Sequence, residues 1–327
     1  MHVMIIGAAG MIGRKLAAAI AKDGLPGGTP VTALTLADVI TPETPTGLAV
    51  PAHLVSLDLS QQGAADRLVE ARPDIIIHLA AIVSGEAEAD FDKGYRINLD
   101  GTRGLFDAIR HAHDADGYTP RVVFASSLAV FGAPFPDRIP DTFHLTPLTS
   151  YGTQKAIGEL LLEDYTRRGY FDGIALRLPT ICIRPGLPNK AASGFFSGIL
   201  REPLNGKEAI LPVEDSVRHF FASPRAAVAF LLHASTLDTS VMGHKRSLTM
   251  PGLSATVADE IEALRKVAGD AAIALINRAP DATIAGIVAG WPQDFDTHWA
   301  KELGFSAETT FDEIIAIYQQ DEMKPQD

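Results

Sequence analysis

The first half of the chain alternates short apolar runs with amphipathic stretches of helical length, and this alternation restricts the possible folds most strongly. The apolar runs, which predict strands, are centred on Ile5, Leu34, Leu54, Ile76, Val123 and Ala175. The stretches with helical periodicity cover residues 11–22, 62–71, 95–113 and 151–168. Runs without polar alternation, such as Ile75 to Ile77, are typical of parallel strands that helices cover on both faces. The alternation therefore predicts a doubly wound α/β fold around a parallel sheet.

The pattern changes after Leu178, where the elements become shorter and mixed. Proline and glycine interrupt the segment 184–188. Helices are predicted at 224–235, 256–268 and 311–319, loops at 24–30 and 41–47, and a polar, frayed tail at 321–327. We expect one domain over residues 1–178 and a smaller mixed lobe over residues 179–327, from which some segments return to the sheet.

The composition narrows the classes of protein to which the chain can belong. A formal net charge of −12, without any run rich in lysine and arginine, argues against a nucleic-acid-binding protein. Cys182 is the only cysteine, which excludes an intrachain disulfide and favours a buried structural thiol over a catalytic one. The chain starts with a strand-like run rather than a basic leader, and no apolar stretch reaches the roughly 20 residues of a membrane span. We therefore expect a cytoplasmic protein with no nucleic acid, membrane or metal as partner.

A glycine-rich turn, Gly7-Ala-Ala-Gly10-Met-Ile-Gly13, follows the first strand and opens the first helix. In such a turn the first glycine permits the tight bend, the second lets the backbone approach a pyrophosphate, and the third allows close packing of helix on sheet. The N-terminus of the helix favours the anion. The alternative to a pyrophosphate site is that these glycines only form a β–α turn that binds no ligand. The turn predicts that residues 1–178 form a Rossmann domain that binds a dinucleotide through Gly7, Gly10, Met11, Ile12 and Gly13.

Asp38 ends the second predicted strand and bears on which dinucleotide is bound. A carboxylate there accepts hydrogen bonds from the ribose hydroxyls of the adenosine and repels a 2′-phosphate. No arginine or lysine follows in residues 39–42 to hold such a phosphate. The sequence therefore predicts NAD rather than NADP as cofactor, unless Asp38 is only a turn residue.

Further cofactor contacts are expected at the ends of later strands. Asp58 is predicted to bond the adenine edge, unless it only starts a helix. The segment 78–81 ends the fourth strand with small side chains, so the backbone of Leu79, Ala80 and Ala81 would line the cofactor, whereas His78 is interpreted as a structural histidine of the strand. Asn98 would hold a backbone kink or a water near Lys155; a plain surface asparagine is an equal alternative.

Tyr151 and Lys155 stand four residues apart in a predicted helix, with Ser127 upstream. Positions i and i+4 share one helix face, so the phenol and the ammonium can reach the same pocket. A tyrosine with its reference pKa of about 10 is a poor base. A neighbouring cation favours the phenolate and lowers the pKa. The spacing therefore predicts acid–base chemistry at Tyr151.

Together these motifs resemble the extended short-chain dehydrogenase/reductases, the NAD-dependent epimerase/dehydratase family. The elements that carry the resemblance are the glycine turn, Asp38, Asp58, the segment 78–81, the segment 126–132 and the Tyr151–Lys155 motif. The resemblance covers residues 1–180 well and the rest loosely. It implies that Ser127 hydrogen-bonds the reacting oxygen, that Tyr151 exchanges its proton, and that Lys155 lowers the tyrosine pKa and holds the nicotinamide ribose. Ser126 is a further candidate for contact with the same ligand, and a strand-capping role is the alternative for Ser127.

The second half departs from the pattern of nucleotide-sugar enzymes in the same family. The asparagine and the Tyr-Gly-Pro element expected after the sixth strand are replaced by the sequence of residues 177–186, and the later Arg-Asp-aromatic element appears as residues 218–224. Two arginines, Arg184 and Arg218, remain, and a guanidinium suits a small carboxylate. This pattern resembles the D-erythronate dehydrogenase branch of the family. The resemblance implies NAD-dependent oxidation of a sugar acid at its C2 hydroxyl, and we assign both arginines to the substrate carboxylate, with surface ion pairs as the alternative.

Two other functions are compatible with the sequence. A nucleotide-sugar epimerase or dehydratase would keep its NAD tightly bound, so reduced cofactor would not accumulate with free substrate. A dinucleotide-binding regulator would have no need of Ser127, Tyr151 and Lys155. The family resemblance also implies a homodimer, in which the helices at 95–113 and 151–168 of both subunits form a four-helix bundle.

Overall fold

The computed structural model describes residues 1–186 and 193–323 of the chain. By its internal contacts the chain divides into two compact units. The first consists of Met1–Val130, Thr149–Arg177 and Val228–Leu248, and the second of Phe131–Leu148, Leu178–Ala227 and Thr249–Asp327. The sequence predicts domains over 1–178 and 179–327 with segments of the second returning to the sheet; here the first unit takes residues 228–248 and the second unit takes residues 131–148. Residues 187–188 of the proline-rich segment and residues 324–327 of the tail lie outside the described residues.

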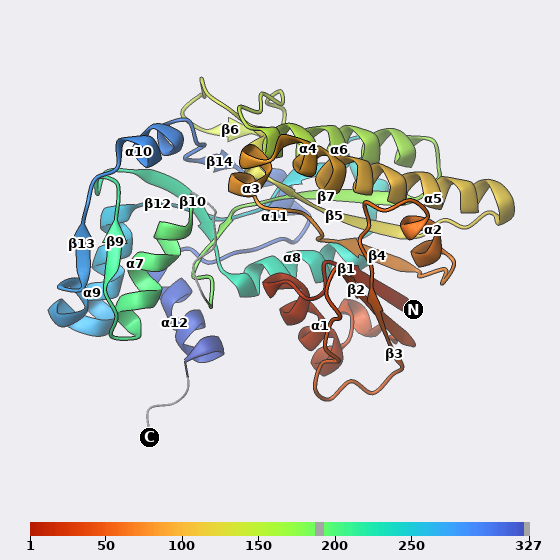
Figure 1. The fold of residues 1–327 in the computed structure, drawn as a ribbon, viewed down its shortest axis with the longest axis horizontal. Coiled ribbons are helices and arrows are strands. Elements are labelled where there is room, and N and C mark those ends of the chain that lie inside the picture. Colours follow the sequence, from red (N-terminus) through yellow and green to blue (C-terminus); the bar gives the residue numbers. More distant parts are fainter. Residues whose placement is uncertain (187–192, 324–327) are drawn as a thin grey trace. The chain divides into compact units, whose positions relative to one another are not determined.

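A seven-stranded sheet forms the centre of the first unit (Figure 1). In spatial order its strands are β11 (Ser247–Thr249), β7 (Asp172–Leu178), β5 (Arg121–Ser127), β4 (Ile75–His78), β1 (His2–Ile6), β2 (Ala33–Asp38) and β3 (Ala52–Ser56). The pairs β1–β2, β1–β4, β2–β3 and β4–β5 are parallel. The strand order changes direction between β1 and β4, and a ligand crevice forms at such a switch point.

The strands form because their apolar side chains are buried on both faces of the sheet. Val3 to Ile6 of β1 and Ile75 to Ile77 of β4 are at most 2% exposed. Leu105, Phe106 and Ile109 of the helix that follows β4 pack against one face, in one cluster with residues of β1, β4 and β5. Burial of each such side chain contributes about 1.5–3 kcal/mol to folding. The continuous apolar runs of the sequence are thereby explained.

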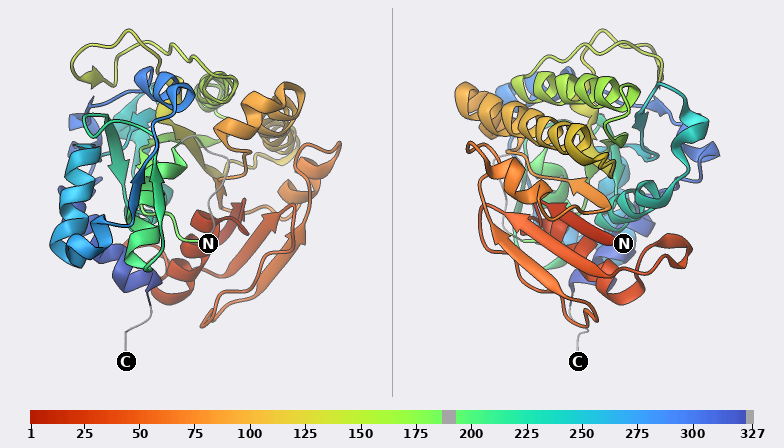
Figure 2. Two further views of the ribbon diagram at one scale, coloured as in Figure 1. Left: turned by 60° about the vertical axis from the view of Figure 1, so that its left-hand side comes forward. Right: turned by 90° about the vertical axis from the view of Figure 1, so that its right-hand side faces the viewer.

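Helices cover both faces of this sheet (Figure 2). One face carries α2 (Ala64–Val69), α5 (Gly101–Asp116) and α6 (Ser150–Arg167), and the other carries α1 (Met11–Asp23) and residues 228–236 of α8 (Pro224–Thr236). Between β4 and α5 lie α3 (Ser84–Ala89), α4 (Phe91–Gly94) and the π-helical segment η2 (Tyr95–Asp100). Short 3₁₀ turns are η1 (Pro26–Gly28), η3 (Leu128–Val130) and η4 (Thr239–Met242). The predicted doubly wound α/β fold is confirmed.

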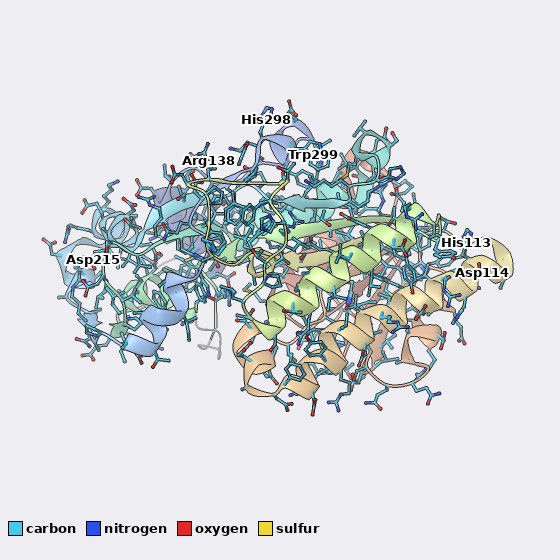
Figure 3. The ribbon with its side chains drawn as sticks, turned by 90° about the horizontal axis from the view of Figure 1, so that it is seen from above. His113, Asp114, Arg138, Asp215, His298 and Trp299 are labelled. Atoms are coloured by element: carbon cyan, nitrogen blue, oxygen red, sulfur yellow. The ribbon has the colours of Figure 1, made fainter. Side chains whose placement is uncertain are left out.

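Several predicted boundaries differ from those in the structure. The segment predicted as one helix over 95–113 begins as the π-helical η2 and continues in α5 to Asp116. There Gly117, with a φ of 79°, ends the helix, and its backbone N donates to the carbonyl of His113 at 2.8 Å. Figure 3 shows His113 and Asp114 in this last turn. The predicted helix over 62–71 is shorter, because Gly63 adopts a left-handed conformation with a φ of 75° just before α2.

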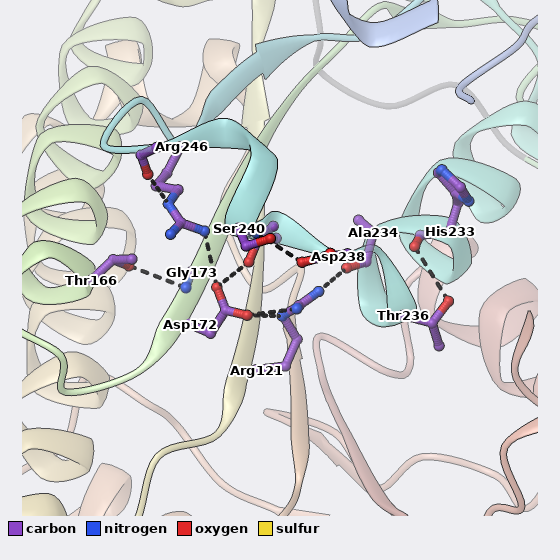
Figure 4. Close-up of polar contacts among 12 residues, drawn as sticks. Arg121, Thr166, Asp172, Gly173, His233, Ala234, Thr236, Asp238, Ser240 and Arg246 are labelled. Atoms are coloured by element: carbon purple, nitrogen blue, oxygen red, sulfur yellow. Dashed lines mark hydrogen bonds and ion pairs between the residues drawn. The ribbon is translucent and has the colours of Figure 1, made fainter. Parts of the chain in front are cut away.

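A polar network attaches the returning segment 228–248 to the strands of the first unit (Figure 4). The guanidinium of Arg121 on β5 donates to Asp172 Oδ2 on β7 at 2.6 Å and to the carbonyl of Ala234 at 2.7 Å. Asp172 Oδ1 accepts from Arg246 Nη1 at 3.0 Å and from Thr239 Oγ1 at 2.5 Å. One carboxylate therefore joins two strands to a segment more than sixty positions further along the chain.

In the part of the second unit that the structure describes, three small sheets form. They are formed by β8 (Thr180–Ile181), β10 (Arg218–Ala222) and β12 (Leu253–Thr256), by β9 (Ala209–Leu211) and β13 (Ile276–Arg278), and by β6 (Ile139–Pro140) and β14 (Phe295–Asp296). Its helices are α7 (Gly194–Leu204), α9 (Val257–Ile273), α10 (Ala282–Ala289), α11 (His298–Glu302) and α12 (Phe311–Glu322). Both α9 and α12 start with a capping box, at Thr256 and Thr310.

The core of the second unit is apolar and includes the single cysteine. Cys182 is fully buried beside Phe196 and Phe221, and burial raises the pKa of its thiol. This agrees with the predicted structural role of the thiol. At the surface, Arg278 of β13 pairs with Asp215, which Figure 3 labels. Among the helices that the structure describes, none combines the length and the apolar character needed to cross a lipid bilayer.

Candidate active site

The glycine turn lies at the switch point of the sheet, directly after β1. Gly7 has a φ of 92°, and a Cβ atom added there would lie 2.7 Å from the backbone nitrogen of Ala80, which follows β4. A Cβ atom at Gly13 would lie 2.3 Å from the carbonyl oxygen of Gly7. Both positions therefore require glycine because backbone segments approach them closely. This explains how the turn fits between β1, α1 and the end of β4.

Gly10 has a different environment from the other two glycines. A Cβ atom at Gly10 would meet, within 4 Å and among the described residues, the carbonyl oxygen of Gly7 at 3.3 Å. Gly10 is the N-cap of α1, and the first intrahelical bond runs from Arg14 N to its carbonyl at 2.9 Å. The backbone N–H groups of Met11 and Ile12 thus stand in the first turn, where helix geometry provides no acceptor. The turn fits the pyrophosphate of a dinucleotide, which needs an open approach and such donors.

Asp38 lies at the end of β2 and also supports the glycine turn. Its Oδ2 accepts from the backbone N of Ala9 at 2.8 Å and its Oδ1 accepts from the backbone N of Val39 at 2.7 Å. Each carboxylate oxygen keeps a further lone pair for a ribose hydroxyl. The bond to Ala9 could not be predicted from sequence patterns, because it joins residues 29 positions apart.

Asp58 and the segment after β4 flank the same end of the sheet. The carboxylate of Asp58 accepts from Ser60 N at 2.9 Å, from Ser60 Oγ at 2.7 Å and from Gln61 Nε2 at 3.1 Å. It thus caps the turn that leads to α2, as in the alternative role considered for it. Leu79 N donates to the carbonyl of Ile6 at 2.8 Å, which places Leu79, Ala80 and Ala81 beside the end of β1.

Asn98 is buried in the π-helical segment η2 and is not a surface residue. Its Oδ1 accepts from Ile82 N at 2.8 Å, and its Nδ2 donates to the carbonyl of Ile82 at 3.2 Å. The same Nδ2 donates to Gln154 Oε1 at 2.8 Å. Asn98 therefore ties the backbone that follows Ala81 to the residue preceding Lys155. The departure from regular helix agrees with the predicted backbone kink.

The structure brings Tyr151 and Lys155 to one face of α6. The Thr149 side chain caps this helix by accepting from Gly152 N at 3.0 Å. Lys155 is 3% exposed, and its Nζ donates to the carbonyl of Ala125 at 2.7 Å. The same Nζ lies 4.6 Å from the ring centroid of Phe124 and 5.8 Å from that of Tyr151. Burial lowers the pKa of Lys155 to about 8, although the charge of Glu159 acts in the opposite direction.

Ser126 and Ser127 end β5 and have different partners. The hydroxyl oxygen of Ser127 is half-buried and accepts from Ala129 N at 3.2 Å. A hydroxyl that accepts in this way can still donate its proton to a ligand. The Ser126 hydroxyl is buried and donates to Glu159 Oε1 at 2.5 Å, so contact with a substrate would require it to leave this bond. Glu159 was missed in the sequence, although it lies one helical turn beyond Lys155.

His78 is enclosed beneath this site. Its Nε2 lies 2.9 Å from Thr102 Oγ1, and its ring lies 5.6 Å from that of Phe124. Burial, together with the charge of Lys155, lowers the pKa of His78 to about 3. The imidazole is therefore neutral, which agrees with the structural role expected for it.

Arg184 and Arg218 belong to the second unit. Arg184 follows β8, and its Nε donates to the carbonyl of Ile181 at 3.0 Å. Arg218 begins β10, is exposed, and donates to the carbonyl of Ser254 at 3.3 Å. His219, which follows Arg218, is buried, stacks on Phe196 and lies 2.6 Å through Nε2 from Thr180 Oγ1. The burial and the contacts of His219 could not be predicted from the sequence, because its partners belong to other elements of the chain.

Comparisons with known proteins agree on one family. The model of the NAD dependent epimerase/dehydratase family matches residues 3–244. A D-erythronate dehydrogenase of Cupriavidus necator is 45% identical over 325 residues, which are 98% of each chain. A D-erythronate dehydrogenase of Haemophilus influenzae is 39% identical over 96% of this chain and 98% of its own.

Solved structures give the same picture of the fold. The crystal structure of a nucleoside-diphosphate-sugar epimerase from Agrobacterium tumefaciens is 64% identical, covers 99% of this chain and 94% of its own, and superposes with a TM-score of 0.97. A GalE-like L-threonine dehydrogenase from Cupriavidus necator, at 21% identity, covers 98% and 99% with a TM-score of 0.84. The second likeness concerns the fold alone.

Proposed function

Because the chain belongs to the NAD-dependent epimerase/dehydratase family, we propose that it oxidises the C2 hydroxyl of a small sugar acid, D-erythronate, to the 2-oxo acid. The observation that carries the proposal is the buried Lys155 ammonium, 5.8 Å from the ring of Tyr151 on the same helix face. The substrate is supported by the two nearly full-length relatives that are named D-erythronate dehydrogenases.

In this proposal Tyr151 is the general base that takes the proton of the C2 hydroxyl. The positive charge of Lys155, one helical turn away, favours the phenolate that this step requires. Ser127 donates a hydrogen bond to the same substrate oxygen and stabilises its developing charge. NAD, when bound, would supply the hydride acceptor.

The first unit offers a consistent set of groups for that cofactor. The turn from Gly7 to Gly13 would hold the pyrophosphate with the N–H groups of Met11 and Ile12. Asp38 would accept from the adenosine ribose, and Asp58 would contact the adenine edge in addition to capping the turn before α2. The backbone of residues 79–81, which precedes the Ile82 that Asn98 binds, would line the cofactor, and Lys155 would hold the nicotinamide ribose. We assign NAD rather than NADP because Asp38 carries the charge that repels a 2′-phosphate.

Arg184 and Arg218 are proposed to bind the carboxylate of the sugar acid, since a guanidinium can pair with both of its oxygens. Replacing either arginine by alanine is expected to raise KM for D-erythronate by about tenfold or more, the factor equivalent to 1.4 kcal/mol of lost binding. A matched control is Arg225→Ala, because Arg225 is also in the second unit but pairs at the surface with Asp321. Unchanged KM values in both variants would remove these arginines from the substrate site.

The decisive assay mixes the protein with NAD and D-erythronate and follows the absorbance of the reduced cofactor. Accumulation of reduced cofactor is expected with the wild-type protein. Tyr151→Phe should lower kcat by at least about 100-fold, the usual contribution of a general base, while Tyr170→Phe should leave it unchanged. Failure of the wild-type protein to reduce NAD with any four-carbon sugar acid would refute the proposed function.

A nucleotide-sugar epimerase is the second candidate, because the 64% identical solved structure carries that name. Such an enzyme returns the hydride to its substrate, so free reduced cofactor does not accumulate. The same absorbance assay with nucleotide sugars therefore separates the two functions.

The protein is further proposed to be a homodimer through α5 and α6. These helices contact each other in the first unit, and Leu160 on α6 is 58% exposed although it is apolar. Light scattering at micromolar concentration is expected to give twice the chain mass, and Leu160→Arg is expected to give a monomer. A monomeric mass for the wild-type protein would refute the dimer.

A further inference from the structure

A buried ion pair lies one turn beyond Lys155 on the same face of α6. Its members are Glu159 and Arg177 of β7, whose side chains are 1% and 5% exposed. Arg177 Nη2 donates to Glu159 Oε2 at 2.8 Å, and Arg177 Nε donates to both carboxylate oxygens at 3.0 and 3.1 Å. Burying an ion pair costs desolvation energy. The presence of this pair one helical turn from Lys155 therefore suggests that it has a role there.

A third group fixes the same carboxylate. The Ser126 hydroxyl donates to Glu159 Oε1 at 2.5 Å from the end of β5. Glu159 is thus held by bonds from two strands at once, and one of them comes from the neighbour of Ser127. The carboxylate of Glu159 therefore has a fixed and buried position.

The charged and titratable groups around Lys155 come from three elements. Tyr151 and Glu159 share its helix, His78 lies on β4, and Arg177 lies on β7 and is bound to Glu159. His78 is neutral at working pH because its pKa is lowered to about 3. Burial disfavours the ammonium, and Glu159 is the anion that counteracts this effect. Lys155 Nζ also donates to the Ala125 carbonyl and lies over the Phe124 ring, and neither of these groups carries a charge.

We propose that Glu159 is a positioning residue that keeps Lys155 protonated in its buried place, and that Arg177 and Ser126 hold Glu159 in the orientation for this task. The proposal rests on the proposed function only in so far as Tyr151 needs a cation beside it. Without the carboxylate, Lys155 would lose its proton at lower pH, and Tyr151 would lose its cation within the working range.

The direct test is a titration of Lys155 by NMR on the full chain labelled with ¹³C at lysine Cε, with Lys155→Met to assign the signal. The wild-type midpoint is expected at about pH 8. In Glu159→Gln it should fall by about one pH unit or more, the usual effect of losing a close opposite charge. An unchanged midpoint would overturn the proposal.

The double variant Glu159→Gln/Arg177→Met separates the charge of Glu159 from the damage that an unpaired Arg177 would cause. Replacing a buried pair as a whole is better tolerated than breaking it, so this variant also decides the matter if the single variant fails to fold. The lowered midpoint is expected to persist in the double variant. A return to the wild-type midpoint would mean that the unpaired arginine caused the effect, and the proposal would fall.

Asp164→Asn is the matched control, since Asp164 lies on the same helix but is 58% exposed and pairs with Arg167. It should leave the Lys155 midpoint unchanged; an equal fall there would overturn the specific role of Glu159. With D-erythronate and NAD, the alkaline limb of kcat/KM should move to lower pH in Glu159→Gln by the same amount as the midpoint. If the wild-type protein does not turn over this substrate, the proposed function fails, but the titration still decides the role of Glu159.

Discussion

The carboxylate of Asp38 accepts a hydrogen bond from the backbone nitrogen of Ala9, 2.8 Å from Oδ2. Asp38 ends β2, and Ala9 lies in the middle of the glycine turn that follows β1. The residue assigned to cofactor choice therefore also supports the loop assigned to the pyrophosphate. A variant of Asp38 has to be designed so that it changes the charge and preserves this bond.

Asp38→Asn is expected to lower the preference for NAD over NADP by about tenfold or more, which corresponds to 1.4 kcal/mol. The amide removes the repulsion of a 2′-phosphate, and its oxygen can still accept from Ala9, whereas the bond from Val39 N is lost because the amide nitrogen only donates. The measurement is the ratio of kcat/KM for the two cofactors, with the exposed Asp23→Asn as control. A wild-type protein that prefers NADP would contradict the assignment.

The pair Gly10→Ala and Gly13→Ala separates binding from folding. At Gly13 the new methyl group would lie 2.3 Å from a backbone oxygen, so denaturant unfolding should show a loss of about 2–3 kcal/mol. At Gly10, with a φ of −68°, the chain should keep its stability within about 0.5 kcal/mol.

The affinity for NAD, measured by calorimetry, should nevertheless fall by about tenfold or more in Gly10→Ala, because the methyl group would occupy the approach to the pyrophosphate. Unchanged NAD affinity in this variant would show that the cofactor does not approach the backbone there.

Gly158→Ala is expected to destabilise the protein although alanine favours helices. The added methyl group would lie 2.9 Å from Cζ of Phe124, the ring beneath the Lys155 ammonium. We expect a net loss of about 1–2 kcal/mol in urea unfolding. At Gly198 in α7 a Cβ atom would meet none of the described atoms within 4 Å, so Gly198→Ala should gain about 0.5–1 kcal/mol. Equal effects at the two sites would argue against the close packing of α6 on Phe124.

The buried Lys155 should make stability depend on pH. In the folded protein Lys155 loses its proton at about pH 8, whereas a lysine of the unfolded chain keeps its ordinary pKa of 10.5. Between these values the unfolded chain binds more protons, so the folded state gains stability as pH rises. Below pH 8 the buried charge costs up to about 3 kcal/mol, from 1.36 kcal/mol per unit of pKa.

Lys155→Met should therefore be more stable than the wild-type protein at pH 7, and the difference should shrink between pH 8 and 10.5. Urea midpoints of both proteins across this range test the expectation. A difference that does not change with pH would mean that Lys155 titrates normally in the folded protein.

Much of the first unit could be predicted because its signals are local. The six predicted strands and the helices starting at Met11 and Ser150 lie where the apolar runs and helical periods placed them. The family resemblance and the class of an NAD-dependent oxidoreductase are confirmed by the family match and by the relatives. The spacing of Tyr151 and Lys155 needed only helix geometry to predict a shared face.

Sequence by itself thus determined the α/β alternation, the glycine turn and the pairing of Tyr151 with Lys155, since each depends on residues within one helix turn or one β–α junction. Only the tertiary structure decided that Asp38 supports the turn, that Asn98 joins Ile82 to Gln154, and that Ser126 and Arg177 fix Glu159 beneath the lysine. It also decided that residues 228–248 belong to the first unit. These relationships join segments far apart in the chain. They arise because a buried polar group needs a hydrogen-bond partner, and the packing of strands and helices decides which group lies within bonding distance.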